Sequence, residues 1–356
     1  MTSGARRESL TICGRDVRPS ERVDISLQVA ESYFGTARSI PVHAWRGRRP
    51  GPTVLVTGAV HGDEINGTGI VRELMLHEPF ELQSGSLVLV PVVNLPGFER
   101  HSRYMPDRRD LNRSFPGSPE GSLARRYAHV LFGELVRKCD YAIDLHTPAV
   151  RRTNFPNVRA NLKDQDVARI AFAFGSGLVV NGKGPKGSLR REAGKIGCPT
   201  IVLEAGEALK FEPTVIEVGV QGVRNVLIEL GMVEGTPLRP LYQARVDKAT
   251  WVRAATGGLL QLHVGPGDLV DEGQPVATTT DLLGGESDVL EAPVDGVIMG
   301  LTTLPAVAPG DPVCHVAVPR DGLASIREAI KASDESLLQR VHQDLSTNVV
   351  VSEPES

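Results

Sequence analysis

Apolar runs of strand length alternate with longer stretches of helical character over the first two thirds of the chain. The runs that predict strands are residues 53–58, 86–93, 140–145, 177–180 and 199–204. The stretches that predict helices are residues 64–77, 120–138, 164–174 and 211–231. Strands that alternate with helices of this length are typical of a mostly parallel or mixed sheet with helices on both faces. The pattern therefore predicts an α/β fold for this part of the chain.

The two ends of this α/β region differ from its middle. Residues 1–20 are polar and are expected to be loosely structured, whereas Val23 to Val42 alternates weakly and predicts one or two opening strands. The pattern changes near Pro237, because the segment 234–240 has the Gly and Pro residues of a linker. We therefore expect a first domain over residues 20–236.

Many short apolar runs, separated by Gly, Pro and Asp, occupy residues 243–318. That spacing predicts a smaller all-β domain, which we place at residues 241–320 and expect to resemble a barrel sandwich. Two phrases within it, Gly265–Val270 and Ala308–Val313, echo each other, and each follows a short strand, so we expect a duplicated hairpin. Residues 321–356 are expected to form a charged helix, over 322–342, followed by a loose tail whose last ten residues are disordered.

Composition and charge narrow the classes of protein that remain. The chain has 356 residues, of which 41% are hydrophobic, and its net charge of −4 argues against nucleic acid as a main partner. It contains neither the roughly 18 uninterrupted apolar residues of a membrane span nor, at its N-terminus, the apolar core of a secretory signal. Four scattered cysteines without a CxxC motif suggest reduced thiols. We therefore expect a cytoplasmic protein that binds neither nucleic acid nor a membrane.

Two short polar strings lie at the ends of predicted strands. His61-Gly-Asp-Glu64 follows one strand, and Asp144-Leu-His146 ends another. His, Glu and His are the usual three protein ligands of a catalytic zinc, which keeps a fourth position open for water or substrate. Because strand ends converge at one edge of an open α/β sheet, these side chains can meet there. The alternative is that His61 and His146 are unrelated loop residues.

Two further features supply groups that the hydrolysis of an amide needs. Glu204 closes the apolar strand that begins at Thr200 and is a candidate general base; the alternative is a strand-end acid in solvent. The loop 94–117 is long and basic, and loops of this length are often functional. Its Arg103 and Arg113 are candidate anchors for an anionic substrate and for an oxyanion, because arginine offers a planar fork for such groups. The alternative is a solvated basic loop, which we expect for some of its other arginines.

The motifs at these positions resemble the succinylglutamate desuccinylase/aspartoacylase family, a branch of the zinc carboxypeptidase fold. The motifs are Gly58-Ala-Val-His61-Gly-Asp-Glu64, Asp110-Leu-Asn-Arg113, Asp144-Leu-His146 and Glu204-Ala-Gly206. The resemblance covers residues 50–232 and implies a zinc carboxypeptidase-like mixed sheet. It also implies one Zn²⁺ ion per chain, bound by His61, Glu64 and His146.

The resemblance implies roles for the other motif residues as well. Glu204 corresponds to the general base, which also passes a proton to the departing amine. Arg103 corresponds to the arginine that polarises the scissile carbonyl. Asn112 and Arg113 correspond to the pair that holds the carboxylate of the substrate.

The chain departs from the family where substrate choice is set. We find no counterpart of the tyrosine that some relatives place over the substrate. Arg190 and Arg191, shortly before the predicted base strand, are candidates for the cation that meets a second substrate charge. Asp144, two residues before His146, either orients that histidine or is a structural acid.

The second predicted domain contains phrases, at residues 267–276 and 292–298, that resemble the strands and turns of biotinyl and lipoyl carrier domains. Those carriers attach their cofactor to a lysine between the two phrases, but residues 277–291 contain no lysine. We therefore expect a cap that shapes the mouth of the active site. The alternative is an oligomerisation surface, which would make the protein a homo-oligomer.

These expectations converge on a zinc-dependent amidohydrolase that removes an N-acyl group from a small anionic N-acyl amino acid or related amine by metal-activated water. One alternative is a carboxypeptidase that acts on short peptides with the same residues. Another is a non-catalytic binding protein on the same fold; Glu204 argues against it, because zinc binding alone does not need that carboxylate. The sequence specifies neither the acyl group nor the amine.

Overall fold

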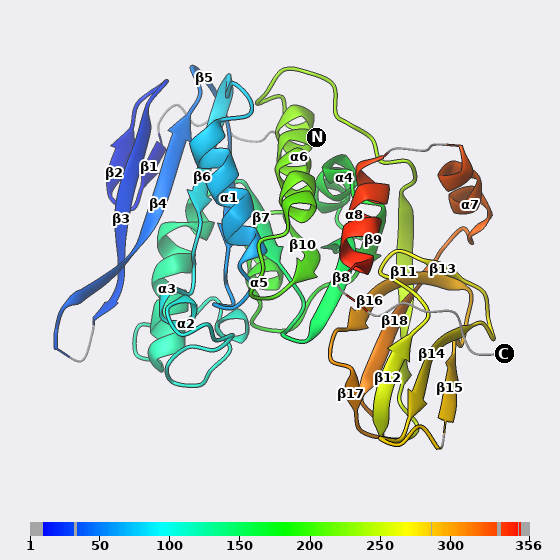
Figure 1. Ribbon diagram of the computed structural model, residues 1–356. Helices are drawn as coiled ribbons and strands as arrows, with labels where there is room; N and C mark the ends of the chain where they lie inside the picture. The colour runs from blue at the N-terminus through cyan, green and yellow to red at the C-terminus, as the bar shows by residue number, and fades with distance from the viewer. Residues whose placement is uncertain (1–9, 32–33, 286, 333–335, 348, 350–356) are drawn as a thin grey trace.

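The computed structural model describes residues 10–31, 34–285, 287–332, 336–347 and 349 (Figure 1). It begins with a small hairpin of β1 (Leu10–Ile12) and β2 (Arg15–Val17). The expectation of a loosely structured start is therefore wrong for residues 10–17. The reason is that Leu10, Ile12 and Val17 are buried in one of the two main hydrophobic cores. The expectation for residues 1–9 lies outside the described part.

The centre of the fold is a mixed sheet within an α/β architecture, as the sequence predicts. Its strands include β3 (Arg22–Glu31), β4 (Ala37–Arg46), β5 (Arg49–Gly58), β6 (Ser84–Val90), β7 (Tyr141–His146), β8 (Arg152–Ala160), β9 (Leu178–Asn181) and β10 (Thr200–Glu207). The neighbours run in the order β9-β8-β10-β7-β5-β6-β4-β3. Strands β6, β5, β7 and β10 are parallel, so their carboxyl ends lie at one edge. That edge is where α/β sheets place their ligand sites.

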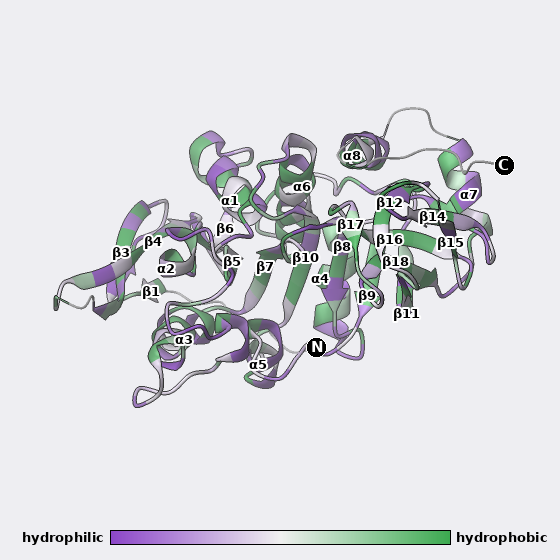
Figure 2. Cartoon of the chain, turned by 60° about the horizontal axis from the view of Figure 1, so that its bottom comes forward, coloured by the Kyte–Doolittle hydropathy of each residue, from purple (hydrophilic) through white to green (hydrophobic). Residues whose placement is uncertain are grey.

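Helices cover both faces of this sheet, as expected (Figure 2). They are α1 (Asn66–His77), α2 (Leu95–Phe98), α3 (Leu123–Glu134), α4 (Gln165–Phe174), α5 (Leu189–Lys195) and α6 (Pro213–Glu229). Successive residues of a strand point to opposite faces. In β5, Val54 and Val56 pack in the core with α1, α4 and α6, whereas Leu55 packs with α3 and α5. This alternation explains why the strand reads as an unbroken apolar run.

Strand β8 and helix α5 were not predicted from the sequence. The nine residues of β8, Arg-Thr-Asn-Phe-Pro-Asn-Val-Arg-Ala, lack an apolar run. The strand nevertheless lies between β9 and β10, parallel to β9 and antiparallel to β10. Its polar side chains line a pocket, described below, which is why they are polar on a central strand.

The C-terminal region contributes β-strands both to the same sheet and to a second, smaller sheet. They are β11 (Ala244–Arg253), β12 (Gly258–Leu262), β13 (Leu269–Val270), β14 (Pro275–Thr280), β15 (Ser287–Glu291), β16 (Gly296–Thr302), β17 (Ala306–Val307) and β18 (Pro312–Pro319). Strand β11 pairs in parallel with β9, and β16 pairs back onto β8, so β8, β9, β11, β18 and β16 close a ring. The sheet thus continues across the expected boundary at residues 236–241. The division into two domains stays a prediction.

The duplicated hairpin forms in only one of its two expected places. Strands β16 and β18 pair as a hairpin around the second phrase. The first phrase instead follows β12, which pairs with β14 and β17, and ends in β13, which pairs with β16. The strands next to the two phrases therefore do not form two separate hairpins. The two-residue β13, at the end of the first phrase, instead pairs with β16, which precedes the second phrase.

Two short helices follow, rather than the single helix expected over residues 322–342. They are α7 (Ala324–Lys331) and α8 (Leu337–Ser346). Helix α8 is not a loose tail, because Leu338, Val341 and Leu345 are buried in the core beside α6. The expectation of a disordered end falls on residues 350–356, outside the described part. No helix in the described part combines the length and apolar character that a membrane crossing requires.

Candidate metal centre and substrate pocket

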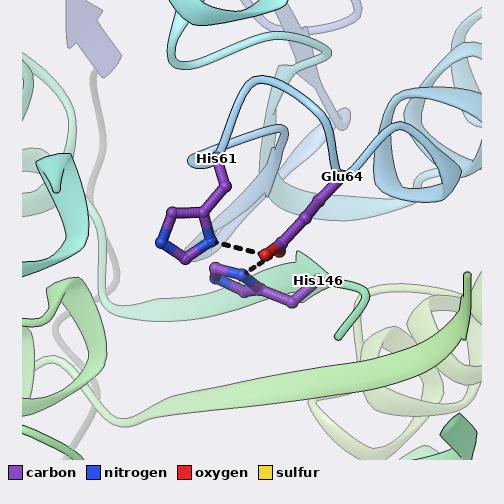
Figure 3. Close-up of side chains that lie close together, drawn as sticks. All are labelled: His61, Glu64 and His146. Atoms are coloured by element: carbon purple, nitrogen blue, oxygen red, sulfur yellow. Dashed lines mark hydrogen bonds and ion pairs between the residues drawn. The ribbon is translucent and has the colours of Figure 1, made fainter. Parts of the chain in front are cut away.

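Three predicted ligands come together at the carboxyl edge of the parallel strands (Figure 3). His61 and Glu64 lie in the loop between β5 and α1, and His146 is the last residue of β7. Strands β5 and β7 are parallel neighbours, with Gly58 opposite Leu145. This register brings the loop after β5 beside the end of β7. The alternative of two unrelated loop histidines is therefore wrong.

The ligand atoms of His61, Glu64 and His146 lie within 4.8 Å of one another. Each histidine turns its Nδ1 atom to a different oxygen of Glu64. His61 Nδ1 lies 2.8 Å from Oε1, and His146 Nδ1 lies 2.6 Å from Oε2. All three residues are buried, with exposed fractions of 3%, 1% and 5% respectively. Two imidazole nitrogens and one carboxylate thus converge on one point.

The outer nitrogens of both histidines are held by carboxylates. His61 Nε2 lies 3.1 Å from Asp110 Oδ1, and His146 Nε2 lies 2.8 Å from Asp144 Oδ2. Thr57 Oγ1 donates a 2.8 Å hydrogen bond to the other oxygen of Asp144. Metal-binding histidines almost always donate their second N–H to such a partner, which fixes the ring. The contacts of Asp144 favour the role of orienting His146.

The charges at this cluster favour a bound cation. Burial alone lowers the pKa of His61 and of His146, but the carboxylates beside them outweigh it and raise both pKa values. Burial raises the pKa of Glu64, and the two imidazoles lower it below its usual range. The buried His61 Nδ1 has no hydrogen bond of acceptable geometry in the described part. Two nitrogens and one carboxylate are a donor set that fits Zn²⁺.

Two glycines fit the backbone of the loop that carries His61 and Glu64 and of the strand that carries Glu204. A Cβ atom at Gly62 would lie 2.1 Å from the backbone carbon of Gly97, so the loop that carries His61 and Glu64 can approach α2 only without a side chain. At Gly206 φ is +71°, in the left-handed region that favours glycine. Both positions explain why these motifs contain glycine.

A pocket of about 340 Å³ opens beside the three ligands. It is lined by most of the predicted site residues: His61, Glu64, Arg103, Asn112, Arg113, His146, Arg190 and Glu204. Arg191 does not line it; this guanidinium donates to the carbonyl oxygen of Gly184 at 3.2 Å. Arg190 is half-buried, its Nη1 atom is buried without a hydrogen-bond partner in the described part, and burial and Arg159 lower its pKa to about 10. Arg190 is therefore the better placed of the two for an anion.

Glu204 lies in register with His146 on the neighbouring parallel strand, so the two side chains share a face of the sheet. Its side chain is 15% exposed, and its Oε1 lies 3.6 Å from Arg159 Nε. The alternative of a strand-end acid in solvent is therefore not met. Arg159, on β8, holds the carboxylate at the pocket wall.

The loop 94–117 brings its predicted residues Arg103, Asn112 and Arg113 to the same pocket as the three candidate metal ligands. Arg103 Nη1 donates to Glu64 Oε1 at 2.6 Å, so this guanidinium touches a ligand carboxylate. Asn112 Oδ1 accepts from the backbone N–H of Leu189 at 2.8 Å, which leaves the NH₂ group of the side chain for a ligand. Arg113 is exposed and donates to the carbonyl of Asn112 at 2.7 Å.

Several residues at the site were not predicted. Asp110 was available from the Asp-Leu-Asn-Arg motif, but no role was assigned to it. Arg152 and Arg159 belong to the unrecognised strand β8. Trp251 and His315 come from β11 and β18, in the C-terminal region. No motif marks these last two, because only the pairing of distant strands brings them to the pocket.

Comparisons with known proteins agree with this arrangement. The catalytic domain of the succinylglutamate desuccinylase/aspartoacylase family matches residues 50–230. N-alpha-acetyl-L-2,4-diaminobutyric acid deacetylase of Halomonas elongata is 31% identical over 81% of this chain and 87% of its own. A probable aspartoacylase of a Synechococcus strain is 27% identical over 63% of this chain and 72% of its own.

Solved structures show the same fold. A succinylglutamate desuccinylase/aspartoacylase of Rhodobacter sphaeroides superimposes with a TM-score of 0.73, at 25% identity, over 85% of this chain and 97% of that one. The product-bound ectoine utilization protein EutE (DoeB) of Ruegeria pomeroyi gives 0.72, at 25% identity, with the same coverage. Because the family's catalytic domain matches more than half of this chain, the chain belongs to the succinylglutamate desuccinylase/aspartoacylase family.

Proposed function

We propose that the protein is a zinc-dependent amidohydrolase that removes the N-acyl group from an N-acyl amino acid or a related amine. The observation that carries this proposal is the convergence of two histidine Nδ1 atoms and Glu64 in a pocket that also holds Glu204. The printed names of the relatives, a deacetylase, a probable aspartoacylase and an amidohydrolase, support hydrolysis of an amide bond. One ion per chain would be held by His61, Glu64 and His146.

A zinc ion at this position would supply a water nucleophile near neutral pH and polarise the scissile carbonyl. Glu204 would take a proton from the attacking water and deliver it to the departing nitrogen. Its burial at the pocket wall and its contact with Arg159 hold the carboxylate for this task. Arg103, beside Glu64, would donate to the developing oxyanion.

The carboxylate of the amino acid would bind where cationic and amide donors meet. We assign Arg113, the NH₂ group of Asn112 and the half-buried Arg190 to this contact. Asn112 Oδ1 is fixed by the backbone of Leu189, the residue before Arg190, so the loop and α5 position their donors together. A small anionic N-acyl amino acid fits a cavity of about 340 Å³ with such a lining.

Residence in the cytoplasm is also a proposal. It is supported by the four cysteines, none of which forms a disulfide. Free thiols are usual in reducing compartments. Fractionation of cells that express the protein with a C-terminal tag, with and without alkylation of free thiols, tests it.

The competing function is a carboxypeptidase that acts on short peptides, since the same residues would serve both. A panel of N-acetyl amino acids and dipeptides that share the same C-terminal residue separates the two. We expect kcat/KM to be higher for the N-acetyl compounds. Faster cleavage of the dipeptides would favour the peptidase.

Replacement of Arg113 by Ala is expected to reduce kcat/KM for a carboxylate substrate about ten- to a hundred-fold more than for its amidated analogue. A charge-assisted contact contributes roughly 1.5–3 kcal/mol, and each 1.4 kcal/mol corresponds to about a factor of ten in rate. The measurement compares acid and amide substrates on wild type and on the variant. Arg109→Ala is the matched control, because Arg109 is exposed on the same loop and outside the pocket. An equal loss on both substrates would show that Arg113 holds the loop instead.

A further inference from the structure

One wall of the pocket carries a cluster from which the proposed chemistry uses only Arg159, through its contact with Glu204. Arg152 and Arg159 come from β8, Trp251 from β11 and His315 from β18. These strands belong to the ring that joins the C-terminal region to the central sheet, right of the centre of Figure 1. The cluster is therefore formed only when both parts of the chain are in place.

Trp251 and His315 form a rigid platform. They lie opposite each other in the antiparallel pair of β11 and β18, and their rings stack with centroids 4.2 Å apart and 6° between the planes. The guanidinium of Arg152 lies 5.2 Å from the centre of the Trp251 ring, within reach of a cation–π contact. The indole thus fixes both the imidazole and the guanidinium at the pocket wall.

The two guanidinium groups beside this platform carry more positive charge than the carboxylates near them balance. Burial, with the charges of Arg159 and Arg152, lowers the pKa of His315 to about 4, so the imidazole is neutral near pH 7. In the described part, no carboxylate lies within ion-pair distance of Arg152, and Arg159 reaches only Glu204, at 3.6 Å. A neutral imidazole beside two guanidinium groups can still donate a hydrogen bond to an anion.

The whole pocket also carries more positive than negative charge. Five arginines line it (Arg103, Arg113, Arg152, Arg159 and Arg190), against two acidic side chains, Glu64 and Glu204. Both acids already have roles, at the metal and as the base. A substrate with a second amino group would therefore meet like charge. One with a second carboxylate would meet guanidinium groups, of which those of Arg113, Arg152 and Arg190 have no carboxylate within ion-pair distance in the described part.

We infer that Arg152 and Arg159, held by the Trp251–His315 pair, form a second anion subsite that binds another carboxylate of the substrate. The enzyme would then prefer doubly anionic N-acyl amino acids. The inference rests on the proposed deacylase function for its kinetic consequence, but the subsite itself binds an anion without turnover. The second carboxylate comes either from the amino acid side chain or from the acyl group.

Four substrates distinguish a second carboxylate on the amino acid side chain from one on the acyl group. N-acetyl-L-norvaline has one carboxylate, N-acetyl-L-glutamate adds one on the side chain, N-succinyl-L-norvaline adds one on the acyl group, and N-acetyl-L-2,4-diaminobutyrate adds an amine. We expect wild-type kcat/KM to be about ten- to a hundred-fold higher for one of the two dianions than for N-acetyl-L-norvaline. The dianion preferred identifies the end of the substrate that the subsite holds. Equal or faster hydrolysis of the norvaline or diaminobutyrate compound would overturn the inference.

Arg152→Met tests the subsite directly, because methionine keeps the apolar stem and removes the charge. We expect it to lose about ten- to a hundred-fold more kcat/KM on the preferred dianion than on N-acetyl-L-norvaline. Arg151→Met is the matched control: Arg151 is the exposed neighbour and does not line the pocket. If Arg152→Met folds poorly, Arg152→Gln serves the same purpose. A uniform loss on both substrates, or the same result for both positions, would contradict the inference.

A binding measurement keeps the subsite separate from the deacylase proposal. Calorimetry of the zinc-loaded protein compares glutarate with butyrate, which differ by one carboxylate. We expect glutarate to bind about ten-fold or more tightly, and Arg152→Met to abolish the difference. If no N-acyl compound is hydrolysed but glutarate still binds in this way, the proposed function fails and the subsite stands. If butyrate binds as tightly as glutarate to wild type, the subsite fails.

Discussion

Glu204→Gln is expected to stop turnover while the metal content stays at the wild-type value. Glutamine keeps the size and the hydrogen-bonding shape of the side chain but cannot take a proton from water. Loss of a general base typically reduces the rate ~10²–10⁴-fold. Because the three proposed metal ligands lie elsewhere, the metal should remain. The measurement is kcat for an N-acetyl amino acid, together with metal analysis of the same preparation.

Glu207→Gln is the matched control for this variant. Glu207 lies on the same strand as Glu204, but it contacts Lys210 and Thr303 and does not line the pocket. We expect its kcat to stay near that of wild type. A Glu204→Gln variant that also keeps wild-type kcat would show that the base is another residue, and the proposed mechanism would be wrong.

His146→Ala is expected to remove the metal and, with it, all measurable activity. The change deletes one of three ligands and leaves the buried carboxylates of Glu64 and Asp144 without the imidazole that lies between them. Metal analysis and a hydrolysis assay on the purified variant test this. Full zinc occupancy would exclude His146 from the site.

Asp144→Asn provides a graded comparison, because it keeps His146 and removes only the carboxylate behind it. Loss of such a partner typically costs about 10–100-fold in metal affinity or activity. We therefore expect a lower affinity for zinc. Excess zinc should refill the site and restore activity. Unchanged affinity would mean that Asp144 is a structural acid, the alternative that the sequence left open.

The parallel centre of the fold was predictable because its strands are buried on both faces. In β5 and β7 every second residue packs in one core and the next in the other, so each strand reads as an apolar run. Strand β8 was not predictable by this criterion. It packs Phe155 and Val158 in the core but turns Arg152, Asn154 and Arg159 to the pocket, and a functional surface overrides the apolar pattern.

The clustering of His61, Glu64 and His146, the candidate metal ligands, was predictable for a related reason. Each lies just after or at the end of an apolar strand, and parallel strands bring those ends to one edge. Arg190 and Arg191 could not be told apart, because neighbouring residues on a helix point in different directions and only the packing of α5 decides which enters the pocket. Trp251 and His315 depend on the pairing of β11 with β18 and β9, which no local pattern encodes.

Return of zinc to chelator-treated wild-type protein tests the central claim most directly. The metal-free protein is titrated with Zn²⁺, and hydrolysis of an N-acetyl amino acid is followed together with the bound metal. The proposed site predicts that activity is absent without metal and rises in proportion to bound zinc. It should level off at one ion per chain, and His146→Ala should not respond at the same concentrations. Full activity of the metal-free wild type, or full recovery of His146→Ala, would contradict a zinc-dependent hydrolase built on His61, Glu64 and His146.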